Sequence, residues 1–81
     1  MKLRVLFFSV LRDITGHEEL KLTCDGITRV DELLTVLFAR WPRLEAWDKS
    51  LLVAVDQSYV KRDALLSEGA EIAVMPPVQG G

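Results

Sequence analysis

The last six residues of the sequence, PPVQGG (76–81), are the part best suited to chemistry. Because glycine makes up about 7% of an average protein, a Gly-Gly ending arises by chance in only about one chain in 200. Neither Gly80 nor Gly81 has a Cβ atom, so a carboxylate at Gly81 can thread a narrow channel and its carbonyl carbon stays open to a bulky nucleophile. A glycyl carboxylate also has no stereocentre to lose while it is held as a mixed anhydride with AMP. The ending is therefore suited to activation and acyl transfer.

Pro76 and Pro77 set the direction of this ending. Each fixes its own φ angle and removes a backbone donor, so a preceding strand must stop there. The four residues beyond them, 78–81, reach at most roughly 13–14 Å when extended. We therefore predict a globular domain over residues 1–75 and an extended, flexible tail over residues 76–81. The plainer alternative is a frayed chain end without a function.

Side chains elsewhere in the sequence do not predict a comparable site. There is one histidine, His17, and one cysteine, Cys24, so neither a Ser-His-Asp triad, an internal disulfide nor a Cys/His zinc site is expected. Phosphate-binding loops of the GxGxxG or GxxxxGK type are also absent. His17 is predicted to be a solvent-facing loop residue and Cys24 a semi-buried small residue. We expect no metal and no cofactor bound by this chain itself.

Size and charge restrict the function further. The 81 residues are 49% hydrophobic and 27% charged, which is typical of one small globular domain with a modest core and little room for a deep pocket. The formal net charge is -2, and the scattered cations give no basic stripe for nucleic acid. The apolar run near Met1 is too short to span a bilayer and lacks a cleavage site. We expect a cytoplasmic protein that is not a self-contained enzyme.

One long helix has the clearest signal in the chain. Its apolar residues recur at offsets of 0, 3, 4, 7, 8 and 11, which trace a single helix face: Val30, Leu33, Leu34, Leu37, Phe38 and Trp41. The Thr28 hydroxyl is predicted to cap the first turn, and Pro42 to end the helix. A loop containing Trp47 is expected to follow.

Five short segments have the composition or alternation of strands: 3–9, 17–23, 51–55, 59–60 and 71–75. Residues 10–16 between the first two predict about one helical turn that ends at Gly16. The fold class is therefore α+β, with a four- to five-stranded sheet and one main covering helix. One helix cannot cover both faces of such a sheet.

The first strand predicts what lies on the uncovered face. Leu3, Val5 and Phe7 point one way and Arg4, Leu6 and Phe8 the other. If the helix covers the first set, Leu6 and Phe8 lie on the open face beside Met75 of the last strand. We predict that these three residues form a docking patch for a protein partner, with Arg12 as a further candidate. The alternative is that the Trp47 loop folds over them.

Four segments together resemble the MoaD/ThiS β-grasp family of sulfur carriers, and within it the small subunits of molybdopterin synthase. They are LRVLFFSVLRDITG, LLVAVDQSYV, LLSEGAEIAVMPPV and the ending PPVQGG. The double proline favours these subunits over the related carriers for thiazole synthesis. Met75 departs from the pattern, because the family often has an aromatic or branched residue there. The resemblance implies a ubiquitin-like β-grasp whose first and last strands lie parallel at the centre of a mixed sheet.

The resemblance also implies a reaction cycle. An E1-like adenylating enzyme of the MoeB type would use ATP to form a glycyl adenylate at Gly81. Sulfur from a donor such as a cysteine desulfurase or a rhodanese would then replace AMP, giving a thiocarboxylate. Inside the large synthase subunit, in a heterotetramer, this group would sulfurate cyclic pyranopterin monophosphate to build the molybdopterin dithiolene.

In that cycle Gly81 is the reacting residue, and the rest of the tail binds the partner: Pro76, Pro77, Val78, Gln79 and Gly80. Three other functions remain open at this point. They are a sulfur carrier for thiazole and thiamine synthesis, a ubiquitin-like modifier conjugated through Gly81 to protein lysines, and an interaction module with an inert tail.

Overall fold

A computed structural model of the chain describes residues 1–77. The first half contains strand β1 (Lys2–Phe7), helix α1 (Val10–Thr15), strand β2 (Glu19–Thr23) and helix α2 (Val30–Arg40). Helix α3 (Pro42–Glu45), the 3-10 helix η1 (Asp48–Ser50) and strands β3 (Leu52–Val55), β4 (Ser58–Tyr59) and β5 (Glu71–Met75) follow. The α+β class and the five predicted strands are confirmed, with every bound within two residues of the prediction.

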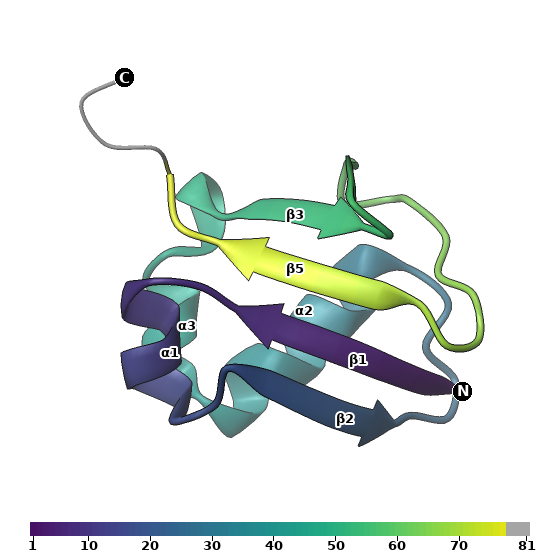
Figure 1. Ribbon diagram of the computed structural model, residues 1–81, viewed down its shortest axis with the longest axis horizontal. Coiled ribbons are helices and arrows are strands. Elements are labelled where there is room, and N and C mark those ends of the chain that lie inside the picture. The colour runs from purple at the N-terminus through teal and green to yellow at the C-terminus, as the bar shows by residue number, and fades with distance from the viewer. Residues whose placement is uncertain (78–81) are drawn as a thin grey trace.

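The five strands form one mixed sheet in the order β2-β1-β5-β3-β4. β1 and β5 run parallel, Val5 opposite Ile72, whereas every other pair is antiparallel. Figure 1 shows α2 crossing one face of the sheet, with β1 and β5 side by side in the middle. This is the β-grasp arrangement that the family resemblance implied. The first and last strands are thereby brought together at the centre of the sheet.

Alternation along the central strands separates a buried face from an open one. Leu3, Val5 and Phe7 are almost fully buried, and so are Ile72 and Val74 of β5. They pack in one hydrophobic core with the predicted helix stripe, of which Val30, Leu33, Leu34 and Leu37 are buried and Phe38 and Trp41 half-buried. Full burial of one such side chain contributes about 1.5–3 kcal/mol. Most of the hydrophobic stabilisation therefore lies on the helix side.

Helix α2 begins differently from the prediction. Arg29, not Thr28, is the residue before the first turn. The Thr28 hydroxyl donates a hydrogen bond to Glu32 instead of accepting one from the helix, and the Glu32 carboxylate also accepts from the backbone N–H groups of Thr28 and Arg29. The N–H groups of residues 30 and 31 donate to backbone carbonyls of the loop after β4, so a Thr28 cap has no donor left to bind.

The segment after α2 is helical where we expected a loop. Pro42 occupies the first turn of α3, where its missing N–H costs nothing and its fixed φ suits a helix. Leu44 is fully buried and Trp47 half-buried against the core. Downstream, Arg62 donates to the Asp48 carboxylate at 2.7 Å and so ties the loop after β4 to η1. Among residues 1–77, no helix is long and apolar enough to cross a membrane.

Candidate functional site

The open face carries the predicted docking residues at the end where β5 finishes. Leu6 lies opposite Ala73 on the parallel neighbour, and Leu52 lies opposite Met75 on the other side. Phe8 follows β1, and its backbone N–H donates to the Val74 carbonyl at 3.3 Å. Leu6 and Met75 are half-buried by their neighbours, whereas Phe8 is 44% exposed. The placement of Leu6, Phe8 and Met75 on one face is as predicted.

Two further apolar side chains belong to the same surface. Leu52 is 36% exposed and Tyr59 is 71% exposed. Tyr59 lies opposite Ala54, which in turn lies opposite Ala73, so it is on the same face of the sheet. We name this surface the open-face patch and define it by its members: Leu6, Phe8, Leu52, Tyr59, Ala73 and Met75. The alternation of side chains in the predicted hairpin could have indicated Leu52 and Tyr59, but it did not show how the hairpin pairs with β5.

The loop that might have covered the patch lies elsewhere. Trp47 packs against the core that α2 shares with the sheet. With residues 1–77 in place, Phe8 is still 44% exposed. The alternative in which the Trp47 loop folds over the open face is therefore wrong.

Arg12 occupies helix α1, which starts two residues after Phe8. Its guanidinium forms an ion pair with the exposed Glu18 carboxylate at 3.0 Å. Exposed pairs of this kind contribute little to stability, at most about 1 kcal/mol. Arg12 is therefore free to exchange Glu18 for another carboxylate, and its place in a docking surface stays a prediction.

The backbone around Phe8 is held in an uncommon conformation. Ser9 has a φ of 57°, a left-handed value that costs a residue with a side chain about 1 kcal/mol or more. This turn redirects the chain from β1 into α1, where Leu11 is fully buried and its N–H donates to the Phe8 carbonyl. The Phe8 ring therefore lies on the open face, whereas the first turn of α1 packs into the core.

The start of the predicted tail is fixed by strand β5. β5 is hydrogen-bonded to β1 on one side and β3 on the other up to Met75. Pro76 and Pro77 follow directly and are half-buried. Val78, Gln79, Gly80 and Gly81 lie outside the described residues, so their roles stay predictions. The described residues define the position from which the tail leaves the sheet.

Glu32, His17 and Cys24 are titratable groups that lie outside the open-face patch. Hydrogen bonds from the backbone N–H and then the hydroxyl of Thr28 lower the pKa of Glu32 below its ordinary value of 4.5. His17 is half-buried instead of solvent-facing, because its ring packs edge-on against Trp41 with 5.8 Å between ring centroids. Cys24 is buried, as expected of a small residue in a core. These groups support the fold around α2 and are not part of the open-face patch.

Comparison with known proteins identifies the family. The sequence pattern that defines the ThiS family matches residues 5–81. The chain belongs to the ThiS family. It is 38% identical to the molybdopterin synthase sulfur carrier subunit of Escherichia coli, over 98% of this chain and 99% of that protein. Residues 78–81, which lie outside the described residues, are thus within the matched region.

Solved structures agree on the fold. The small archaeal modifier protein 1 of Methanosarcina acetivorans is 24% identical, with a TM-score of 0.81 over 99% of this chain and 96% of that one. A Helicobacter pylori chain solved in a complex of subunits 1 and 2 of molybdopterin-converting factor is 23% identical, with a TM-score of 0.69 and full coverage of both chains. The β-grasp of this ThiS-family chain therefore also occurs in a protein described as an archaeal modifier and in a chain of a molybdopterin-converting factor complex.

Proposed function

We propose that this chain is the sulfur carrier subunit of a molybdopterin synthase. The observation that carries the proposal is the match to the E. coli subunit of that description, which extends over nearly the whole of both chains. The Gly-Gly ending and the double proline support the same function. The described residues supply a rigid domain with an apolar open face, and we assign the chemistry to Gly81.

The proposed cycle begins on a partner enzyme. The Gly81 carboxylate attacks the α-phosphorus of ATP and pyrophosphate leaves, which gives the glycyl adenylate. A persulfide sulfur delivered by a cysteine desulfurase or a rhodanese then attacks the Gly81 carbonyl carbon, and AMP leaves with the bonding electron pair. A thiol reduces the resulting acyl disulfide and releases the thiocarboxylate. The partner supplies the nucleotide pocket, so this chain needs none.

The second half of the cycle takes place in the synthase. The thiocarboxylate sulfur is transferred to cyclic pyranopterin monophosphate, and water restores the Gly81 carboxylate, once for each sulfur of the dithiolene. The open-face patch docks on the large subunit, and β5 directs Pro76 and Pro77 toward its active site. Burying the patch excludes water, and the tail then delivers its sulfur without a further search in solution.

Intact-mass measurement tests the carrier chemistry. The chain is incubated with an MoeB-type adenylating enzyme, ATP and a sulfur source. The expected product is heavier by the exchange of one oxygen for one sulfur, and omission of ATP should prevent the gain. A mass that does not change under any of these conditions, with an adenylating enzyme active on another carrier, would contradict the proposal.

Reconstitution with a large subunit separates the pathways. The thiocarboxylated chain should convert cyclic pyranopterin monophosphate to molybdopterin and should fail to support a thiazole synthase. Light scattering should give the mass of two carrier chains and two large subunits, as expected of the heterotetramer. The opposite substrate preference would identify a carrier for thiamine synthesis.

A second candidate function is protein modification, which the likeness to the small archaeal modifier protein favours. In that case Gly81 would form isopeptide bonds with lysines of other proteins after adenylation. Lysine conjugates in the same mass experiment, carrying the full mass of this chain, would support modification. Thiocarboxylate without conjugates would support the carrier alone.

A further inference from the structure

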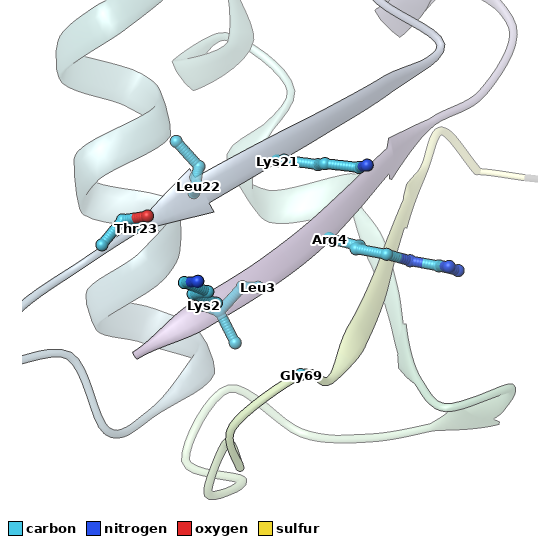
Figure 2. A pocket seen from close by; sticks show the side chains of 7 residues that line it. All are labelled: Lys2, Leu3, Arg4, Lys21, Leu22, Thr23 and Gly69. Carbon is cyan, nitrogen blue, oxygen red and sulfur yellow. The ribbon is translucent and has the colours of Figure 1, made fainter.

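Three cations gather at the other end of the open face. Lys2 and Arg4 of β1 and Lys21 of β2 are exposed, and we name them the basic cluster. Arg4 lies directly opposite Lys21, and Lys2 lies opposite Thr23, one step diagonally from Lys21. Figure 2 shows the Arg4 and Lys21 side chains extending in the same direction from neighbouring strands. The cluster is therefore a feature of the sheet register and not of one flexible loop.

Carboxylates of the same chain neutralise this cluster only in part. Arg4 forms an ion pair with Glu71. Glu68 accepts a hydrogen bond from the Lys2 backbone N–H at 3.0 Å, not from its ammonium. Among residues 1–77, the ammonium groups of Lys2 and Lys21 have no carboxylate within 4.0 Å. Like charges directly opposite each other in an antiparallel pair are destabilising, so the free protein retains a repulsion between Arg4 and Lys21.

The cluster also surrounds a space that a side chain can enter. A pocket of about 240 Å³ is lined by Lys2, Leu3, Arg4, Lys21, Leu22, Thr23 and Gly69 (Figure 2). Four of these, Lys2, Arg4, Lys21 and Thr23, occupy the open-face positions of β1 and β2. Aliphatic stems with cationic ends fit the short apolar stem and charged end of a glutamate or aspartate. Because the pocket is small, it can hold one or two acidic side chains.

The same face joins the cluster to the open-face patch. β1 has six residues and spans about 17 Å at 3.3 Å per residue, with the cluster at its start and Leu6 and Phe8 at its end. A partner that covers the patch and continues along β1 therefore reaches the cluster. Charged contacts at such a margin steer encounter and fix orientation more than they add affinity.

We infer that the basic cluster receives an acidic segment of the large subunit of the synthase, as a second anchor on the open face. The inference rests on the proposed function, which supplies that partner. Two anchors toward opposite ends of β1 define the orientation of β5 on the partner, whereas the apolar patch alone permits rotation about itself. The tail that follows β5 is then aimed at one place.

Charge reversal at Lys21 tests the inference. The Kd of the full chain for the large subunit is measured by titration calorimetry at several NaCl concentrations. Lys21→Glu should weaken binding about tenfold, equivalent to about 1.4 kcal/mol, and should flatten the salt dependence, while Lys21→Arg stays within about twofold of the natural chain. Lys61→Glu is the matched control: it makes the same charge change at an exposed lysine in the loop that bonds to the start of α2. It should bind as the natural chain does.

Stability separates a lost contact from a damaged fold. Glu at position 21 lies opposite Arg4, so Lys21→Glu should raise the unfolding midpoint or leave it unchanged while binding falls. A second measurement needs no substitution: a zero-length carbodiimide cross-linker should join Lys2 or Lys21 of the natural chain to an Asp or Glu of the large subunit.

The outcomes distinguish the inference from the proposed function. If the natural chain does not bind the large subunit, the proposed function fails. If it binds and Lys21→Glu binds equally well, or Lys61→Glu weakens binding as much, the basic cluster is not an anchor. Cross-links confined to other lysines would also overturn the inference.

Discussion

Phe7 and Phe8 are adjacent phenylalanines with opposite environments, and truncating each should have opposite consequences. Phe7 is 2% exposed, and its ring meets Trp41 edge-on with 5.7 Å between centroids. Phe8 is 44% exposed on the open face. We expect Phe7→Ala to damage the fold and Phe8→Ala to damage docking. The pair is its own matched control, because the residue removed is the same.

The expected magnitudes follow from burial. Truncation of a buried Phe costs about 3–5 kcal/mol, a large share of the roughly 4–12 kcal/mol that 81 residues provide. Somewhat more than half of Phe8 is shielded, and full burial is worth about 1.5–3 kcal/mol, so Phe8→Ala should cost roughly 1–1.5 kcal/mol. In docking, the exposed part of a side chain of about 200 Å² contributes about 2 kcal/mol, or roughly 30-fold in Kd.

Urea unfolding followed by Trp fluorescence gives the free energies, and titration calorimetry with the large subunit gives Kd. Phe8→Leu keeps much of the apolar area, so its affinity should fall between those of the natural chain and Phe8→Ala. If Phe7→Ala does not fold, Phe7→Leu replaces it. Equal losses of stability in the two alanine variants, or unchanged affinity in Phe8→Ala, would refute the assignment of one face to the core and the other to a partner.

Three further changes probe the tail, a helix start and a turn. Deletion of Gly81 should abolish sulfur transfer in the intact-mass assay and leave the unfolding midpoint within error; full transfer by the deletion variant would contradict the proposed chemistry. Because its pKa is lowered by Thr28 in the folded protein, Glu32 stabilises the fold above its ordinary value of 4.5, and this stabilisation is lost as the pH falls through the lower folded value. Glu32→Gln should therefore unfold at lower urea than the natural chain at pH 7, with the difference shrinking below pH 4.5; a constant difference would exclude linkage to Glu32. Asp56 and Gln57 both have positive φ in the turn between β3 and β4, so Gln57→Gly should raise the free energy of unfolding by roughly 0.5 kcal/mol, and a loss would show that the side chain contributes more than its backbone costs.

Local periodicity was enough to predict α2 and the two faces of β1. Six apolar residues at helical spacing face one way whatever they pack against, and Leu3, Val5 and Phe7 alternate with Leu6 and Phe8 for the same reason. The topology was not available from these patterns. Which strands are neighbours depends on contacts between residues such as Val5 and Ile72 that are far apart in sequence, and it came from the family resemblance.

The same limit explains what was missed at the site. Leu52 and Tyr59 lie on a hairpin whose alternation was visible, but only the pairing of Leu52 with Met75 places them on the open face. The basic cluster was missed because Lys21 is far from Lys2 and Arg4 in sequence and is brought beside them only by the β1–β2 register. Thr28 was predicted as a cap from its position, but the N–H groups that it would bind donate to backbone carbonyls of the loop after β4, which is far away in sequence.

Under the proposed function, the arrangement explains how a small domain can direct a reactive end into the active site of a partner. β5 is the last strand and lies at the centre of the sheet, paired with β1 on one side and β3 on the other, so the direction of Pro76 is fixed by the part of the sheet that is hardest to open. A slip of β1 by one residue would exchange Phe7 for Phe8 and place Arg4 in the core. The buried residues that stabilise the fold therefore also fix the register of the open face. Different partners can bind different open-face side chains, whereas β5 cannot shift without unfolding the domain.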